Sequence, residues 1–319
     1  MQDQHYLPLV SVTVITYNSS KYVLETLNSI KEQTYKNIEL IVSDDCSSDN
    51  SIEICRKWIK ENKERFSNTE LVTTPVNTGI PANKNRAIAM CKGDWIKSIA
   101  GDDILMSNCI LDNINFIKNN TSINILISNV STFRQIKDRI FIIKENHPPI
   151  GVKMLLPNIS AEQQYKFLLR QYFGNTPSLF ISKNVLDKIR YDEEFPLLED
   201  YPFALNSTKC GFKFDYLNKS TVFYRKHEKS VWSLGTKKKI FNNVYLHRRL
   251  MQLKYIYPYV SCVERIFLNL EFYRKRFLDK TGLNSNNLLG KIINFITRKL
   301  SPNYIYKKIF IYNLMKQRF

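Results

Sequence analysis

The stretch VSVTVITYNSSKYVLETLNSIKEQTYKNIELIVSDDCSSD, residues 10–49, holds two short apolar runs with a helical pattern between them. The first run, residues 9–15, is rich in β-branched residues and predicts a strand that ends in a polar turn. Apolar residues then recur at helical spacing from Val23 to Ile30. The second run, residues 38–42, has the composition of a strand buried on both faces. The stretch therefore predicts a strand, a helix and a second strand in sequence.

The same alternation continues along the next fifty residues. ELVTT at 70–74 predicts a third strand, a helix is expected from Pro81 to about Cys91, and WIKSIA at 95–100 predicts a fourth strand. Alternating strands and helices predict an α/β fold with a mostly parallel sheet, whose ligands bind beyond the carboxyl ends of the strands. The polar segments that follow the first, second and fourth strands are TYNSS (16–20), SDDCSSD (43–49) and AGDD (100–103).

Two pairs of adjacent acids lie in these polar segments. Asp102 and Asp103 follow the fourth strand, and Asp44 and Asp45 follow the second. Adjacent carboxylates repel each other unless a cation or hydrogen-bond donors compensate them. Each pair on its own could be a helix cap or a solvated turn, but strand-end carboxylates are also ligands that Mg²⁺ or Mn²⁺ prefers. The presence of both pairs on one edge favours a binding site.

The segment PVNTGIPANKNRA, residues 75–87, lies close to that edge in the predicted sheet. Its Gly79 and Lys84 are candidate phosphate-binding residues. No GxGxxG follows the first strand and no GxxxxGK[ST] is present, which argues against a dinucleotide-binding site and a P-loop. A nucleotide-like ligand held in another way is the remaining expectation.

Positive charge is concentrated at the C-terminal end of the chain. The net charge is +18, and residues 237–319 contain 18 basic and only three acidic residues. This part is helical and amphipathic in pattern, which fits either solvated helices packed on the rest of the chain or helices on an anionic membrane surface. Nucleic acid would also attract this charge, but no nucleic-acid-binding motif is present, so no nucleic-acid partner is expected.

The cysteines and the termini suggest a compartment. The six cysteines are scattered without a CxxC pair, which argues against a zinc site and fits a reducing cytoplasm. The first ten residues are too polar for a secretion signal, and no window of about 18 apolar residues is present. We expect a cytoplasmic chain, bound peripherally to the inner face of the cell membrane.

Residues 10–49 and NTGIPANKNRAIAMCKGDWIKSIAGDDIL, residues 77–105, together resemble the family-2 glycosyltransferases of bacterial surface-polysaccharide synthesis. Weaker similarity continues through GNTPSLFIS (174–182), LEDYPF (198–203) and YRKHEKS (224–230). The resemblance implies an inverting enzyme of the GT-A fold that uses a nucleotide sugar, most simply a UDP-sugar, and a glycan or lipid-linked acceptor.

The resemblance assigns the donor site residue by residue. It implies that Asp45, with Asp44 beside it, contacts the nucleotide base, and that the backbone around Thr16 and Tyr17 lines the same pocket. The family's metal-binding DxD motif falls on AGDD, residues 100–103, which ends in Asp102 and Asp103.

The implied cofactor is Mg²⁺ or Mn²⁺, bound with the donor diphosphate by Asp102 and by Asp103. His227, after the predicted strand STVFYR at 220–225, is a further candidate metal ligand. The sequence departs from the family at Ala100, where the first acid of the motif usually lies and typically contacts the ribose.

The resemblance also implies a general base. An inverting transfer needs a base that takes the proton of the acceptor hydroxyl, and the family's acid pair maps to Glu199 and Asp200, with Asp200 as the base. Without the resemblance, these two acids between Pro196 and Pro202 would more often be a surface turn.

These assignments divide the chain into three parts. Residues 1–106 are expected to bind the donor, residues 107–235 the acceptor, and residues 236–319 form a basic helical extension. Two alternatives stay open: a non-catalytic protein that binds membranes or polyanions on a GT-A scaffold, and a sugar nucleotidyltransferase. The second is disfavoured because no GxGxR-like loop follows the first strand.

Overall fold

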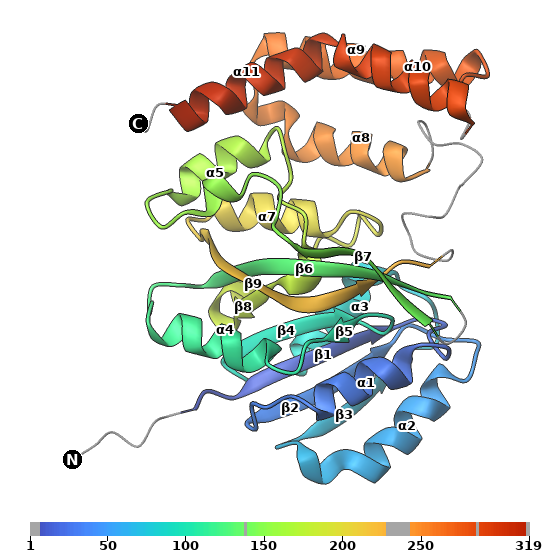
Figure 1. Cartoon of the computed structure of the whole chain (residues 1–319), viewed down its shortest axis with the longest axis vertical. Helices are drawn as coiled ribbons and strands as arrows, with labels where there is room; N and C mark the ends of the chain where they lie inside the picture. The colour runs from blue at the N-terminus through green and yellow to red at the C-terminus, as the bar shows by residue number, and fades with distance from the viewer. Residues whose placement is uncertain (1–6, 137–138, 228–242, 285–286, 317–319) are drawn as a thin grey trace. The chain divides into compact units, whose positions relative to one another are not determined.

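The computed structural model describes residues 7–136, 139–227, 243–284 and 287–316 (Figure 1). The chain forms two compact units. The first contains residues 1–164 and 173–226, and the second contains residues 165–172 and 227–319. The predicted boundary after residue 106 falls inside the first unit, and the longer segment of the second unit begins at His227, near the start of the predicted extension.

Four parallel strands form one half of the sheet in the first unit. They are ordered β3-β2-β1-β4. Thr16 at the end of β1 pairs with Asp44 of β2, and Ile15 pairs with Ala100 of β4. The polar segments that follow these strands therefore share one edge, as the sequence predicted. The bounds are β1 (Val10–Thr16), β2 (Ile38–Asp44), β3 (Thr69–Thr73) and β4 (Trp95–Ala100).

The sheet becomes mixed beyond β4. Strand β8 is antiparallel to both β4 and β6, β9 is parallel to β6, and β5 is antiparallel to β9. Strand β7 pairs with β6 off this path. The pairing of β9 with β5 brings the end of β9 beside the turn that follows β4. The bounds are β5 (Ile104–Leu105), β6 (Ile125–Ile136), β7 (Arg139–His147), β8 (Phe180–Ser182) and β9 (Phe214–Arg225).

The core lies between the sheet and its helices. Val12 of β1 and Leu40 of β2 are completely buried, as expected for parallel strands covered on both faces. Helix α1 presents Leu27 and Ile30 to this core, and Trp58 of α2 donates a hydrogen bond of 2.8 Å to Asn28. The helices of this unit are α1 (Val23–Lys31), α2 (Ser51–Asn62), α3 (Ile80–Ala89), α4 (Cys109–Lys118), α6 (Lys183–Lys188) and α7 (Asp200–Lys209), and α5 (Ala161–Leu168) begins in this unit and ends in the second. The short 3₁₀ helices of this unit are η1 (Lys63–Arg65), η2 (Val152–Leu155) and η3 (Thr176–Ser178), whereas η4 (Tyr257–Tyr259) lies in the second unit.

Helix α9 is the centre of the second unit. It begins with a capping box in which the side chains and backbone N–H groups of Ser261 and Glu264 bond reciprocally. Its Phe272 stacks on Tyr245 of α8, and its Phe267 contacts Tyr306 of α11. No helix among the described residues is long and apolar enough to cross a bilayer. The bounds are α8 (Asn243–Tyr255), α9 (Cys262–Lys280), α10 (Leu288–Lys299) and α11 (Pro302–Lys316).

Candidate active site

Asp44 is completely buried at the end of β2 and organises the turn that follows. Its carboxylate accepts hydrogen bonds from Thr16 Oγ1 at 2.7 Å, from the Ser47 amide at 2.8 Å and from Ser47 Oγ at 2.6 Å. Asp44 therefore ties the ends of β1 and β2 together. Tyr17, the next residue after Thr16, is half exposed at the same edge.

Asp45 joins β2 to the start of α3. Its carboxylate accepts from the Thr78 amide at 3.0 Å, from Thr78 Oγ1 at 2.6 Å and from the Gly79 amide at 2.7 Å. Arg86 lies 3.3 Å from it. Gly79 has φ +88°, a conformation that a residue with a side chain adopts only with strain. Asp45, the predicted contact of the nucleotide base, and Gly79, a predicted phosphate contact, are thus joined by a hydrogen bond.

The turn after β4 holds the second acid pair against β9. Gly101 packs closely on β1, since a Cβ there would lie 2.8 Å from Thr16 Cγ2. Asp103 is buried, and its Oδ1 accepts the Arg225 amide N–H at 2.8 Å. Burial and the adjacent carboxylate of Asp102 raise the pKa of Asp103 well above its usual range. Asp102 is the more exposed of the two acids.

Arg225 is the largest fully buried side chain of the described residues. Its Nε donates to the Asp102 carbonyl at 2.8 Å, and its guanidinium lies 2.6 Å from Glu25. A further hydrogen bond joins it to Gln135, and it lies against the ring of Tyr22. This arginine fixes the backbone on which Asp102 sits. The sequence pattern alone contains no signal for this role.

The predicted base Asp200 lies beside two other predicted site residues. Lys84 Nζ of α3 is 2.7 Å from Asp200 Oδ1 and 2.9 Å from Glu199 Oε1. The exposed fraction of the side chain is 21% for Asp200, but 8% for Glu199 and 10% for Lys84. The predicted phosphate ligand Lys84 is therefore a partner of the predicted catalytic acids in this structure.

Burial and the neighbouring charges both shift the pKa values of the residues in this cluster. Burial alone lowers the pKa of Lys84, but the carboxylates of Asp200 and Glu199 raise it well above its usual range. Burial, and then the charge of Asp200, raise the pKa of Glu199 to about 7, although Lys84 works against both. Burial also raises the pKa of Tyr191, whose ring lies under the Lys84 ammonium at 4.7 Å. Lys84 thus holds two mutually repelling acids together.

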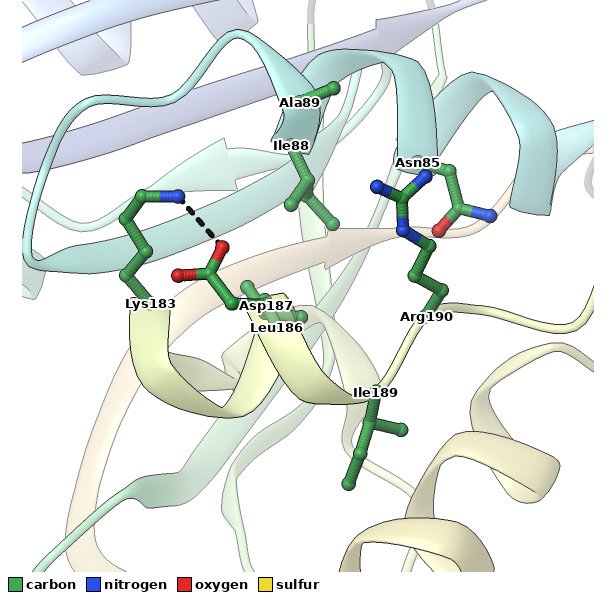
Figure 2. A pocket seen from close by; sticks show the side chains of 8 residues that line it. All are labelled: Asn85, Ile88, Ala89, Lys183, Leu186, Asp187, Ile189 and Arg190. Atoms are coloured by element: carbon green, nitrogen blue, oxygen red, sulfur yellow. Dashed lines mark hydrogen bonds and ion pairs between the residues drawn. The ribbon is translucent and has the colours of Figure 1, made fainter.

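One predicted metal ligand, His227, belongs to the second unit of the chain. His227 lies two residues beyond the end of β9 and begins the longer segment of that unit, and its role as a metal ligand stays a prediction. A cavity of about 180 Å³ lies between α3 and α6 (Figure 2). It is lined by Asn85, Arg190, the Lys183–Asp187 ion pair and four apolar residues, and none of the predicted donor or catalytic residues borders it.

The donor set fits a cation that is completed by substrate oxygens. Within the described residues, no group of three or more His, Cys, Asp or Glu side chains is placed to hold a metal ion. Asp102 provides a hard carboxylate at the edge of the sheet, and Mg²⁺ commonly uses one or two carboxylates together with substrate phosphates. The role of Asp102 as a ligand of such an ion stays a prediction.

Residues 11–188 match the family Glycosyl transferase family 2, which is more than half of the chain. This chain is a family-2 glycosyltransferase. The fold and the recognition of the family from its strand-end motifs are both confirmed.

Some relatives are similar over most of the chain. An uncharacterized glycosyltransferase of Methanocaldococcus jannaschii is 26% identical over 281 residues, covering 82% of this chain and 92% of that protein. WfaP of Escherichia coli, a UDP-Glc:alpha-D-GlcNAc-diphosphoundecaprenol beta-1,3-glucosyltransferase, is 27% identical over 228 residues, covering 70% of this chain and 80% of WfaP. The crystal structure of S. aureus TarS residues 1–349 in complex with UDP-GlcNAc is similar with a TM-score of 0.59 at 19% identity, covering 96% of this chain and 81% of that chain. The likeness to TarS shows the GT-A fold.

Proposed function

We propose that this glycosyltransferase moves a sugar, with inversion, from a UDP-sugar to a hydroxyl group of a glycan or lipid-linked acceptor in cell-surface polysaccharide synthesis. The donor class is supported by TarS, which was crystallised with UDP-GlcNAc, and by the UDP-glucose in the name of WfaP. The acceptor class is supported by the diphosphoundecaprenol-linked sugar in the name of WfaP.

The observation that carries this proposal is the difference in exposure within the acid pair. Asp200 retains a 21% exposed side chain at the first turn of α7, whereas Glu199 and Lys84 are enclosed. An acceptor hydroxyl has to reach the base within hydrogen-bond distance. Asp200 is the accessible acid, and Lys84 positions its carboxylate. A single displacement with one base inverts the anomeric carbon.

The proposed donor site uses the edge formed by β1, β2 and β4. Asp45 and the backbone at Thr16 and Tyr17 would face the nucleotide, and Asp102 would hold Mg²⁺ or Mn²⁺ with the diphosphate. The ion supplies charge stabilisation for the departing diphosphate. The chain's own part is to keep Asp102 in place through the hydrogen bond from Arg225 to its carbonyl.

We place the enzyme on the inner face of the cell membrane, as a peripheral protein. This is supported by the excess of basic residues in the second unit and by a relative that acts on a lipid-linked sugar. An enzyme that uses a lipid-linked acceptor benefits from working beside the membrane that holds it.

The experiment is a transfer assay with a panel of nucleotide sugars and of glycan and lipid-diphosphate acceptors, with products identified by mass spectrometry. NMR of the product should show the anomeric configuration opposite to that of the donor. Asp200→Asn should lower turnover by ~10²- to 10⁴-fold with donor affinity nearly unchanged. Asp187→Asn, which changes an exposed acid of α6, is the matched control.

Three results would contradict the proposal. Retention of configuration would exclude the inverting mechanism. Normal turnover of Asp200→Asn would assign the base to Glu199 or to another acid. A chain that binds membranes but neither transfers nor hydrolyses any donor would favour the non-catalytic alternative.

A further inference from the structure

Helix α10 has its polar and apolar sides reversed relative to a helix of a water-soluble domain. Its side toward α9 is polar: Thr297 Oγ1 accepts from Arg274 at 2.6 Å, and Asn294 Oδ1 lies 3.4 Å from the same guanidinium. A surface helix normally turns its apolar residues toward the core and its polar residues outward. Here the helix is held to its neighbour by hydrogen bonds.

The outward side of α10 carries its apolar residues. Five of the twelve residues of this helix are large apolar side chains that are 45% to 73% exposed, and Leu300, directly after the helix, is 72% exposed. They recur every three or four positions, so they share one side of the helix. These residues are Leu288, Leu289, Ile292, Phe295, Ile296 and Leu300, which directly follows the helix.

The exposed charged residues of the described second unit are all basic. The acids of the described second unit, Glu264, Glu271 and Asp279, are buried or half-buried. Glu264 lies 2.6 Å from Arg170, Glu271 lies 2.7 Å from Arg274, and Asp279 accepts a hydrogen bond from an asparagine at 2.7 Å. The exposed basic residues of the same described unit are Lys166, Arg248, Lys254, Arg276, Lys280, Lys291, Arg298, Lys299 and Lys308.

This charge distribution decides which partner fits the apolar side of α10. A second copy of the chain would bring Lys291 and Arg298 of both copies together, with no exposed acid in the described second unit to pair with them. An anionic bilayer offers hydrocarbon to the apolar residues and phosphate groups to the flanking lysines and arginines. Helix α9, which contacts α10, adds an exposed apolar stripe at helical spacing: Val263, Ile266, Leu270, Tyr273 and Phe277.

We propose that α10 is an interfacial membrane helix, which lies along an anionic leaflet with its apolar side in the headgroup–acyl boundary. The inference deepens the proposed function, since it names the surface that keeps the enzyme at the membrane of its acceptor. At 1.5 Å per residue the helix is about 18 Å long, so it lies in the plane of the leaflet. Lys291 and Arg298 then contact lipid phosphates while Leu289 and Phe295 enter the apolar region.

The experiment is co-sedimentation of the full chain with vesicles of phosphatidylglycerol and phosphatidylcholine, compared with pure phosphatidylcholine, across a salt series. Wild-type protein should bind the anionic vesicles and release them as salt rises. The double variant Leu289→Gln/Phe295→Gln removes two side chains that are 59% and 55% exposed, and should lower the partition coefficient roughly 20-fold. The matched control is Leu24→Gln/Leu156→Gln in the first unit, where the two leucines are 48% and 47% exposed.

A charge-reversal pair tests the electrostatic part separately. Lys291→Glu/Arg298→Glu should lower binding at low salt by about 30-fold or more, with less dependence on salt. Lys57→Glu/Lys60→Glu on α2 makes the same change in net charge at exposed positions of the first unit. It should bind almost as wild type does.

The results that would refute the membrane role of α10 differ from the results that would refute the proposed function. Equal binding of the α10 variants and wild type, or equal binding to neutral vesicles, would refute the membrane role of α10. A lower melting temperature of Leu289→Gln/Phe295→Gln would show that the protein itself covers this side. Dissociation of a wild-type dimer by the same variant would assign the surface to a second copy. Donor hydrolysis should persist in both α10 variants, and Asp200→Asn should bind vesicles normally, so each proposal can fail alone.

Discussion

The ammonium group of Lys84 lies 2.7 Å from Asp200 Oδ1 and 2.9 Å from Glu199 Oε1, and so joins α3 to the start of α7. The three groups carry one positive charge and up to two negative charges in a largely buried cluster. Lys84 comes from the segment that follows β3, and the two acids come from the part expected to bind the acceptor. Lys84 therefore links the part of the chain expected to bind the donor to the part expected to bind the acceptor.

Removing the Lys84 charge should destabilise the first unit. Lys84→Met leaves Glu199 and Asp200 adjacent without their cation, and breaking a buried ion pair in this way costs about 3–5 kcal/mol in unfolding free energy. Lys183→Met, which removes one partner of the exposed pair with Asp187, should cost less than about 1 kcal/mol. Urea denaturation of both variants measures the difference. Equal, small losses would show that the buried cluster is not held by Lys84.

The pH dependence of stability should reveal the raised pKa of Glu199. Burial and Asp200 raise it from 4.5 to about 7, so the folded state binds this proton more tightly than the unfolded state. The contribution is fully present below about pH 4.5 and is lost as the pH rises through about 7. Lys84, whose pKa is raised above an already high value, does not titrate in this window.

Glu199→Gln removes this titration. Wild-type protein should therefore lose unfolding free energy relative to the variant as the pH rises from about 4.5 to about 7, with no further relative change just above that window. Urea denaturation followed by fluorescence suits the test, because Trp58 and Trp95 both lie in the first unit. Parallel pH profiles of the two proteins would exclude a raised pKa at Glu199.

The two adjacent acids after β4 should be separable by substitution. Asp102→Asn should abolish the EDTA-sensitive part of UDP binding, because Asp102 is the partly exposed acid of the pair, whereas Asp103 is buried. Asp103→Asn should keep most of that binding, since its oxygen accepts the Arg225 amide N–H and an asparagine oxygen can do the same. Calorimetry with UDP and Mn²⁺, with and without EDTA, measures both. Equal losses in the two variants would make Asp103 a metal ligand as well.

Arg225 should support donor binding without contacting the donor. Arg225→Met removes hydrogen bonds to the Asp102 carbonyl and to Glu25, and should cost about 3 kcal/mol in unfolding free energy. Because the turn that bears Asp102 loses its anchor, Mn²⁺-dependent UDP affinity should fall as well. Arg190→Met, at the exposed arginine beside the α3–α6 cavity, is the control. A stable variant with unchanged affinity would exclude an anchoring role.

Local patterns in the sequence were sufficient to predict the parallel half of the sheet. The β-branched run that becomes β1 and the apolar run that becomes β2 determine buried strands, and the intervening helical spacing determines α1. Because consecutive parallel strands end at one edge, the clustering of Asp44, Asp45 and Asp102 followed from their positions after the strands. The same motifs identified the family.

Only the tertiary structure decided which side chains meet. The contact of Lys84 with Asp200 spans 116 residues, and that of Arg225 with the Asp102 carbonyl spans 123. Residue spacing places a side chain on one side of its own helix or strand. Which residue it contacts so far along the sequence depends on how β8, β6 and β9 add to the sheet. The reversed polarity of α10 is likewise a tertiary property, because its sequence predicts two sides and only packing against Arg274 of α9 decides that the apolar side faces outward.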